Sequence, residues 1–153
     1  MEDKESLLES IRPAAILKAI TPEAKRATIR KCLGNGIIGI WDFPFRIGRE
    51  SRVKEIDGLL VVYEREKKSN EKPNNDFYLV DHEKFLHISR EHFEIEKNEN
   101  SYFLRDRDST CGTMVNDVIL HKKTQYCVHE LKDGDIITIG LNDSPYKFQF
   151  IVF

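Results

Sequence analysis

The chain has 153 residues, of which 40% are hydrophobic and 33% are charged, and its formal net charge is −2 at pH 7. This length and composition predict one soluble globular domain. A nearly balanced charge excludes a global basic field for nucleic acid, so any anion site must be local. No apolar stretch approaches the ~20 residues that span a bilayer, and the acidic start of the chain lacks the basic start and apolar core of a secretory signal. We therefore expect neither nucleic acid nor a membrane as a partner.

The cysteines and histidines do not form a metal-binding pattern. The three cysteines are odd in number and widely spaced, at Cys32, Cys111 and Cys127. Such a set favours a reducing cytoplasm over a disulfide framework. The histidines are scattered, and Cys127 and His129 lack the accompanying cysteine pair that is typical of a zinc site. The sequence therefore predicts a cytoplasmic protein without a metal or another cofactor.

An apolar stripe near the N-terminus predicts a short helix. Apolar side chains recur at the helical spacing of three and four residues, at Leu7, Leu8, Ile11, Ala15, Ile16, Ala19 and Ile20. Pro13 interrupts the stripe, because its ring removes a helical donor and disfavours helix at the preceding residue. We expect a turn before Pro13, a helix over residues 13–20 and an N-terminal helical extension over residues 1–24. Three roles remain open for this helix: packing on the domain, a partly ordered tail, or binding to a partner.

From residue 25 onward the pattern predicts a domain built from β-strands. We expect strands over residues 28–33, 37–41, 45–47, 59–63, 77–80, 93–96, 102–105, 118–120, 127–128, 135–139 and 146–153. Many short strands separated by turn signals are typical of a sandwich of two sheets. Residues 64–75 are charged and lack an apolar anchor, so residues 50–76 are predicted to be an enlarged loop or an extra hairpin. The predicted fold class is all-β, a sandwich of two mostly antiparallel sheets over residues 25–153.

Three of the predicted turns carry groups that can hold an oxyanion. Arg49 follows Gly48, a Ser-Arg-Glu-His segment starts at Ser89, and a Ser-Thr-Cys-Gly-Thr segment starts at Ser109. A guanidinium can donate two N–H groups to one phosphate, while hydroxyls and the amides of glycine turns add neutral donors. The three blocks together therefore indicate a local oxyanion site.

The order and spacing of these blocks resemble the forkhead-associated (FHA) domain family, whose pattern is Gly-Arg, then Ser-x-x-His, then Ser/Thr-x-Gly-Thr-x-x-Asn. The resemblance covers roughly residues 25–153 and implies an FHA-type β-sandwich that binds phosphothreonine peptides. It also implies a non-catalytic module for phosphorylation-dependent protein–protein interaction in signalling. The implied partner is a phosphothreonine-containing protein, either a Ser/Thr kinase or the substrate of one.

The resemblance implies roles for individual residues. Contact with the phosphopeptide is implied for Arg49, Ser89, Arg90, Thr110, Cys111 and Asn116. Support of the site from within the fold is implied for Gly48, His92, Gly112 and Thr113. A small apolar niche beside Thr110 is implied to favour phosphothreonine over phosphoserine. One buried methyl is worth ~1 kcal/mol or somewhat less by transfer alone, so packing must add to any strong preference.

Cys111 departs from the family pattern, which usually has an asparagine there to bind the peptide main chain. A thiol is a weak donor and acceptor, and the loss of two amide hydrogen bonds costs roughly 1–3 kcal/mol, or about tenfold to a hundredfold in affinity. One alternative is therefore a phosphate-independent scaffold with a degenerate FHA site. Another is a thiol hydrolase that uses Cys111, His92 and Asp108, although the common hydrolase motifs are absent. If Arg49 and Arg90 lie close to Cys111, they favour its thiolate, and oxidation of the thiol then weakens binding.

Overall fold

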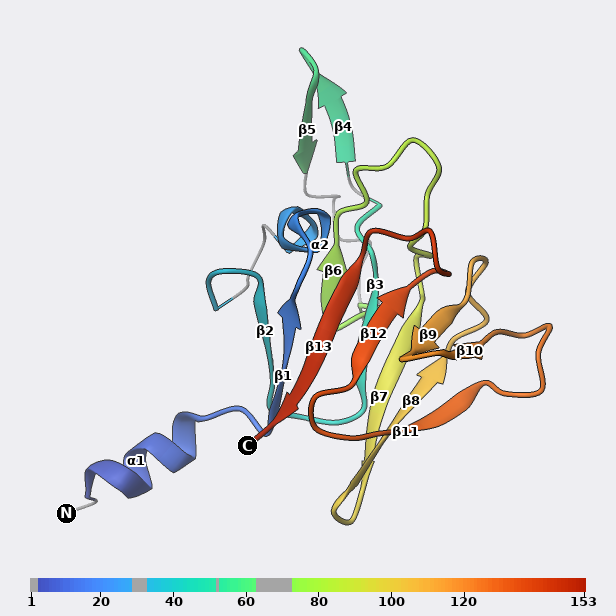
Figure 1. Cartoon of the computed structure of the whole chain (residues 1–153). Helices are drawn as coiled ribbons and strands as arrows, with labels where there is room; N and C mark the ends of the chain where they lie inside the picture. The colour runs from blue at the N-terminus through green and yellow to red at the C-terminus, as the bar shows by residue number, and fades with distance from the viewer. Residues whose placement is uncertain (1–2, 29–32, 52, 63–72) are drawn as a thin grey trace.

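The computed structural model describes residues 3–28, 33–51, 53–62 and 73–153. Two sheets, of six and five strands, pack against each other, and a separate two-stranded hairpin projects from one end of the molecule (Figure 1). The predicted sandwich of two mostly antiparallel sheets is confirmed.

The six-stranded sheet consists, from edge to edge, of β10 (Val118–Leu120), β9 (Thr113–Val115), β12 (Ile136–Ile139), β13 (Lys147–Val152), β1 (Ala15–Ala19) and β2 (Ile37–Ile40). The five-stranded sheet consists of β11 (Val128–Leu131), β8 (Ser101–Asp106), β7 (Phe93–Asn98), β3 (Phe45–Arg49) and β6 (Phe77–Leu79). Neighbouring strands within both sheets run antiparallel, except that β3 and β6 pair in parallel. This parallel pair brings the ends of β3 and β6 to the same edge of the sandwich.

Alternation of buried and more exposed side chains builds the core between the two sheets. Phe93 and Ile95 of β7 are fully buried, and Phe148 and Phe150 of β13 are buried in the same alternation. Tyr102 of β8 and Phe150 of β13 meet edge to face across the interface, with ring centroids 5.4 Å apart. Full burial of such a side chain stabilises the fold by about 1.5–3 kcal/mol. The period-two pattern of the sequence therefore determines which face of each strand turns inward.

The N-terminal segment differs from the sequence prediction. Helix α1 spans Lys4–Ile11, and the predicted helix over residues 13–20 is wrong, because residues 15–19 form β1. β1 lies between β13 and β2 and pairs with both. Its consecutive apolar residues 15–17 are all buried, and a short apolar run of this kind suits a central strand as well as a helix. The predicted boundary after residue 24 therefore does not separate a helical extension from the sandwich.

A second helix, α2 (Pro22–Ala27), follows β1. The Thr21 hydroxyl caps it by accepting a hydrogen bond from the Ala24 amide, and Pro22 occupies its first turn. Thr28 ends this helix, and most of the strand predicted over residues 28–33 lies outside the described residues. In the described part of the chain, neither helix has the length and apolarity needed to cross a membrane.

An extra hairpin follows β3. Strands β4 (Val53–Ile56) and β5 (Leu59–Val62) pair antiparallel. Asp57 and Gly58 join them with φ values of 50° and 78°, as a two-residue hairpin turn with left-handed residues requires. The hairpin is one of the two alternatives predicted for residues 50–76. The charged segment over residues 64–75 lies mostly outside the described residues.

Candidate functional site

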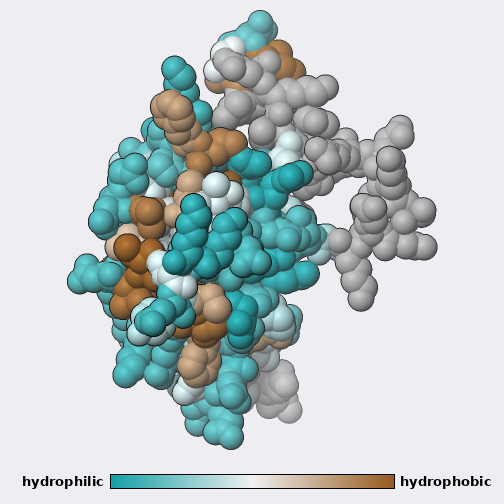
Figure 2. All heavy atoms as spheres, turned by 90° about the vertical axis from the view of Figure 1, so that its right-hand side faces the viewer, coloured by the Kyte–Doolittle hydropathy of each residue, from teal (hydrophilic) through white to brown (hydrophobic). Residues whose placement is uncertain are grey.

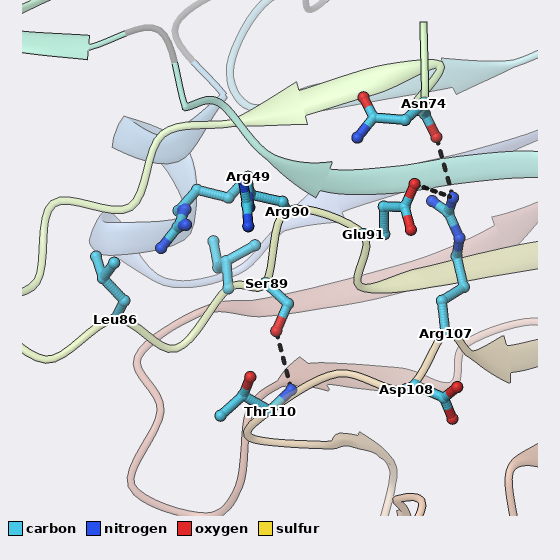
Figure 3. A pocket seen from close by; sticks show the side chains of 10 residues that line it. Arg49, Asn74, Leu86, Ser89, Arg90, Glu91, Arg107, Asp108 and Thr110 are labelled. Carbon is cyan, nitrogen blue, oxygen red and sulfur yellow. Dashed lines mark hydrogen bonds and ion pairs between the residues drawn. The ribbon is translucent and has the colours of Figure 1, made fainter.

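A pocket of about 710 Å³ lies at one end of the sandwich (Figure 3). It is bordered by the end of β3, by the segment before β6, and by the connections that join β6 to β7 and β8 to β9. The pocket is lined by Arg49, Asn74, Leu86, Ile88, Ser89, Arg90, Glu91, Arg107, Asp108 and Thr110. The structure thus brings together four of the residues predicted to contact a phosphopeptide, namely Arg49, Ser89, Arg90 and Thr110.

Gly48 lets β3 approach the β6–β7 connection closely. A Cβ atom at this position would lie 1.9 Å from the carbonyl oxygen of Arg90 and 2.5 Å from Nδ2 of Asn75. Glycine alone fits this approach without a shift of the backbone. The amide of Arg49 donates to the carbonyl of Ser89 at 2.9 Å. These contacts hold residue 49 directly beside the segment that carries Ser89 and Arg90.

Asn75 joins two of the connections, although no pattern in the sequence singles it out. It is buried, and its Nδ2 donates to the Arg90 carbonyl at 2.6 Å while its Oδ1 accepts from Arg107 at 2.7 Å. Arg107 also donates to the Asn74 carbonyl at 3.1 Å and lies 3.5 Å from a carboxylate oxygen of Glu91 (Figure 3). The guanidinium of Arg107 is therefore already engaged by protein groups at the pocket rim.

His92 lies inside the fold between two of the connections. The Ser89 amide donates to its Nδ1 at 2.9 Å, so Nε2 carries the proton and donates to the Gly112 carbonyl at 2.8 Å. Burial lowers the pKa of His92 to about 4, although the Gly112 hydrogen bond and the charge of Asp106 oppose this effect. The imidazole is therefore neutral at pH 7 and bridges the β6–β7 and β8–β9 connections.

Asp81 braces the β6–β7 connection and is a second residue without a sequence signal. Its carboxylate accepts hydrogen bonds from the amides of His87 and Ile88 at 2.7 and 2.9 Å. It also accepts from the Tyr146 hydroxyl at 2.7 Å, and burial together with this contact raises the pKa of Tyr146. The Asp81 carboxylate is buried, and its hydrogen bonds fix the part of the β6–β7 connection at which Ile88 borders the pocket.

Asp106 braces the β8–β9 connection in the same manner. Its carboxylate accepts from the hydroxyls of Ser109 and Thr113 at 2.6 and 2.8 Å, and from the Ser109 amide at 3.0 Å. The Ser109 hydroxyl in turn accepts from the Gly112 amide at 2.9 Å. Gly112 has a φ of +83°, which favours glycine. This closed turn presents Thr110 at its exposed side, toward the pocket.

Ser89 and Thr110 connect two sides of the pocket. The Thr110 amide donates to the Ser89 hydroxyl oxygen at 2.9 Å (Figure 3). The hydroxyl oxygen is thus oriented as an acceptor within the protein, and among the described residues its own proton has no acceptor. The pocket therefore contains a hydroxyl donor whose position is set by a backbone amide.

Arg49 and Arg90 give the pocket its positive charge. Figure 3 shows both side chains reaching into the space between Leu86 and Ser89. Neither forms an ion pair with a carboxylate of the described residues, whereas Arg46 on the same strand as Arg49 is paired at 3.2 Å. Two guanidinium groups that form no ion pair with the described residues, beside a hydroxyl donor, can hold a tetrahedral oxyanion, and Glu91 and Asp108 leave the pocket with a smaller positive charge.

Cys111 does not line this pocket, in contrast to Thr110 next to it. Its Sγ lies 3.5 Å from the carbonyl of Leu86. Burial raises the pKa of the Cys111 thiol, and the charges of Asp143 and Asp81 add to this effect. The expected stabilisation of its thiolate by arginines is therefore wrong, because carboxylates are the charged groups that act on the sulfur.

Asn116 also lies outside the residues that line the pocket. It has a φ of +52° in the turn after β9, donates to the Asp135 carboxylate at 3.1 Å and accepts from the Ile136 amide at 3.0 Å. These contacts tie it to the start of β12. Asn116 lies away from the pocket because β9 runs away from it. Thr113 begins this strand near the pocket, and Asn116 follows its far end.

The site offers little for other chemistries. Within the described ranges, no three His, Cys, Asp or Glu side chains gather as they do around a metal ion. Both ring nitrogens of His92 are engaged by backbone groups, which leaves neither to act as a base for Cys111. The arrangement is therefore suited to binding an anion.

Comparisons with known proteins agree with this geometry. The FHA domain family model matches residues 45–140. Among solved structures, Mycobacterium tuberculosis EmbR in complex with a low-affinity phosphopeptide has a TM-score of 0.53 and 19% identity, covering 92% of this chain and 24% of that chain. A structure from a study of phosphothreonine-dependent FHA domain interactions has a TM-score of 0.52 and 20% identity, covering 91% of this chain and 96% of that chain. The yeast Pml1 splicing factor has a TM-score of 0.53 and 16% identity, covering 91% of this chain and 79% of that chain.

At these identities the similarity concerns the fold, and the chain spans only about a quarter of the length of EmbR. No curated protein matches the chain. The family model and the fold together confirm the resemblance found in the sequence.

Proposed function

Because the chain belongs to the forkhead-associated (FHA) domain family, we propose that it binds phosphothreonine peptides and so mediates phosphorylation-dependent protein–protein interaction. One observation carries the proposal. Arg49 and Arg90 line the pocket beside the Ser89 hydroxyl and have no carboxylate partner among the described residues. A phosphate ester, with a charge of about −1.5 to −2 at pH 7, supplies the missing counter-charge.

Arg49 and Arg90 act as the charged donors, and Ser89 and Thr110 act as the neutral ones. A hydrogen bond to a charged group contributes about 1.5–3 kcal/mol at most. The Ser89 hydroxyl donates its proton to the phosphate while its oxygen continues to accept from the Thr110 amide. Ordering of an extended peptide offsets much of this gain, so the expected affinity is micromolar.

Leu86 favours phosphothreonine over phosphoserine. It lines the pocket next to Ser89, is 49% exposed and provides apolar surface for the γ-methyl group of a phosphothreonine, while Ile88 also borders the pocket but is only 1% exposed. A buried methyl group contributes about 0.8 kcal/mol, which alone gives a roughly fourfold preference. Closer packing of the methyl against these side chains increases the preference further.

Four of the remaining predicted residues support the site without lining it, namely Gly48, His92, Gly112 and Thr113. Asn116 instead lies beyond the far end of β9, at the start of β12, and takes no part in the proposed contact with the peptide. Gly48 permits the close approach of β3, and His92 bridges two connections. Cys111 stands at the edge of the site, where its weakly polar thiol contributes little to a grip on the peptide main chain.

The proposed partner is a phosphothreonine-containing protein in a signalling context, either a Ser/Thr kinase or a kinase substrate. We place the interaction in the cytoplasm, since Cys111 and Cys127 are both free thiols, which suits a reducing compartment. The proposal assigns no catalytic role to the chain.

A phosphothreonine peptide library, compared with the same library after dephosphorylation, tests the proposal. We expect the chain to retain the phosphorylated pool. Arg49→Ala should weaken binding of a selected peptide by about a hundredfold, with little change in melting temperature. Arg105→Ala is the matched control, because it removes a guanidinium that pairs with Glu96 at 3.1 Å on the surface of β8. It should leave the affinity unchanged.

Two results contradict the proposal. Equal affinities of Arg49→Ala and Arg105→Ala would remove Arg49 from the site. Equal retention of the phosphorylated and dephosphorylated pools would instead favour the phosphate-independent scaffold.

A further inference from the structure

Asn75 is a polar residue that the fold removes from water. Figure 2 shows the side of the molecule that lies at the right of Figure 1, where hydrophilic residues cover most of the surface and hydrophobic patches interrupt it. Asn75 is hydrophilic as well, but it is only 2% exposed. Burial of an amide costs free energy unless its polar atoms form hydrogen bonds, so the partners of Asn75 indicate what it does.

The backbone at Asn75 is tied to β3 and to β6. The amide of Asp76 donates to the carbonyl of Arg46 at 2.8 Å, and the amide of Arg46 donates to the Asp76 carboxylate at 2.8 Å. The Asn75 amide donates to the Tyr78 hydroxyl at 3.4 Å, and this hydroxyl donates to Oδ1 of Asn74 at 2.8 Å. The side chain of Asn75 therefore starts from a backbone that the two strands hold in place.

The side-chain amide of Asn75 lies between a group that only donates and a group that only accepts. The guanidinium of Arg107 donates to Oδ1 at 2.7 Å, and the carbonyl of Arg90 accepts from Nδ2 at 2.6 Å. These partners leave one orientation for the amide. An aspartate would turn an oxygen toward the Arg90 carbonyl, and an alanine would leave both partners without a bond. The position therefore requires a side chain that carries both a donor and an acceptor.

Hydrogen bonds fix both peptide units that flank the Cα atom of Arg90. The carbonyl of Ser89, in the unit before this atom, accepts from the Arg49 amide at 2.9 Å. The carbonyl of Arg90, in the unit after it, accepts from Nδ2 of Asn75. Because each peptide unit is planar, the orientation of the two units determines φ and ψ at the residue between them. Asn75 therefore contributes to the direction in which the Arg90 side chain leaves the backbone.

The same amide also packs against the strand that carries Arg49. A Cβ atom at Gly48 would lie 2.5 Å from Nδ2 of Asn75, so the amide fills the space beside this glycine. Asn75 thus separates the two backbone segments from which Arg49 and Arg90 extend into the pocket. It does not line the pocket itself.

We propose that Asn75 is a positioning residue for phosphate binding, and that it acts through Arg90 by setting the place of this guanidinium relative to Arg49. The proposal rests on the proposed function, because the bound phosphate is the same one. Charge-assisted hydrogen bonds depend on distance and direction, so a shift of the Arg90 backbone weakens the grip on a phosphate that Arg49 also holds.

Titration of the full chain with one phosphothreonine peptide, selected from the library, tests this role. Asn75→Ala should weaken binding about tenfold and also lower the melting temperature. Leu17→Ala is the control for lost stability, because Leu17 is fully buried in the apolar core. It should leave the affinity of the folded protein unchanged. Asn98→Ala removes an exposed asparagine of β7 and should change neither quantity.

A double-mutant cycle separates positioning from structural support. In Arg90→Ala, no guanidinium is left at this place for Asn75 to position. The affinity of the double variant Asn75→Ala, Arg90→Ala should therefore equal that of Arg90→Ala to within about twofold. A merely structural role of Asn75 predicts instead that the two losses multiply.

Asn75→Asp gives a second measurement with a side chain of the same shape. It keeps an acceptor for Arg107 but replaces the donor to the Arg90 carbonyl by an oxygen. It should weaken binding about as much as Asn75→Ala, and it carries the test if Asn75→Ala does not fold. Wild-type affinity in folded Asn75→Asp would overturn the proposal.

Failure of this proposal differs from failure of the proposed function. Unchanged affinity of folded Asn75→Ala, or losses that multiply with that of Arg90→Ala, overturns the positioning role and leaves phosphothreonine binding intact. Equal affinities of the wild-type chain for the phosphorylated peptide and for its unphosphorylated version overturn the proposed function, and the positioning role falls with it.

Discussion

The connections that border the pocket at Arg49 and the strand β1 are both parts of the sandwich, but different chemistry holds them in place. Beneath the connections lie the polar side chains of Asp81, His92 and Asp106, and each forms hydrogen bonds with loop groups. β1 instead presents Ala15 and Leu17, both fully buried, to an apolar core. Polar bracing supports the pocket, and apolar packing supports the strand.

The difference has a consequence for binding. Hydrogen bonds fix direction, whereas apolar packing has no preferred direction. In the described part of the chain, every buried side-chain nitrogen or oxygen has a hydrogen-bond partner, so the bracing leaves no unpaired polar group. We infer that the connections are ordered before the ligand arrives, which reduces the entropic cost of binding.

Replacement of Asp106 by alanine should have the largest combined effect on stability and on phosphopeptide binding. It removes the acceptor for the Ser109 amide and for two hydroxyls, so the expected loss in the free energy of unfolding is on the order of 3 kcal/mol. Leu17→Ala is the matched apolar change and should cost about 2–5 kcal/mol. Urea denaturation measures both losses. Only Asp106→Ala should also weaken phosphopeptide binding by the protein that remains folded.

Peptide titration at a temperature at which both variants are folded completes the test. An equal loss of affinity in Leu17→Ala and Asp106→Ala would mean that the pocket depends on overall stability and not on polar bracing.

Gly48→Ala should weaken peptide binding by more than the addition of one methyl group would suggest. The new methyl group meets the Arg90 carbonyl, so the segment with Ser89 and Arg90 must move, at a cost of about 1–3 kcal/mol. We expect an affinity loss of about tenfold or more by titration. Gly134→Ala is the control, because Gly134 has a φ of +89° and open space around its Cβ position. It should cost about 1–2 kcal/mol of stability through its backbone alone and leave affinity unchanged.

His92 should give the fold a pH dependence that the apolar regions lack. The folded protein keeps His92 neutral down to about pH 4, whereas the unfolded chain takes up a proton below about pH 6.5. Stability from this residue is therefore fully present above pH 6.5 and is lost as the pH falls toward 4, by up to about 3 kcal/mol. His92→Ala should cost about 1–3 kcal/mol at pH 7. This cost should shrink at pH 4.5 in denaturation measurements, and a cost that does not change with pH would contradict the assignment.

The sequence was sufficient to predict which blocks meet at the pocket and, through the family resemblance, the support by His92, but it was insufficient to predict the bracing by Asp81 and Asp106. Arg49, Ser89 and Thr110 lie in short blocks whose spacing is itself the signal, and the structure brings these blocks together. Asp81 and Asp106 are single carboxylates in polar segments, and nothing in the sequence distinguishes them from solvated ones. Their burial depends on strands that arrive from elsewhere in the chain. The one local clue is Asp106 three residues before Ser109, a spacing at which a side chain can cap a turn.

The strands also divide into those that the sequence predicted and those that it did not. Alternation predicted the β7–β8 hairpin, because both strands have one face in the core. Alternation missed β9, whose three residues are all buried, and the spacing of three and four between apolar residues wrongly assigned β1 to a helix. Strands buried on both faces lose the period-two signal, and short apolar runs then fit either structure.

Substitutions in α1 should have the smallest effect, although this helix lies only a few residues before β1. None of its residues is buried, and it points away from the sandwich and from the connections that border the pocket (Figure 1). Leu7→Ser and Leu8→Ser should therefore change the free energy of unfolding by less than about 0.5 kcal/mol and leave phosphopeptide affinity unchanged. Denaturation and peptide titration measure the two quantities. An isolated helix of eight residues is marginal in water, so a loss above about 1 kcal/mol would show that the helix packs on the sandwich in solution. The contrast with Leu17→Ala would then disappear, and the N-terminal segment would belong with β1 to the apolar part of the fold.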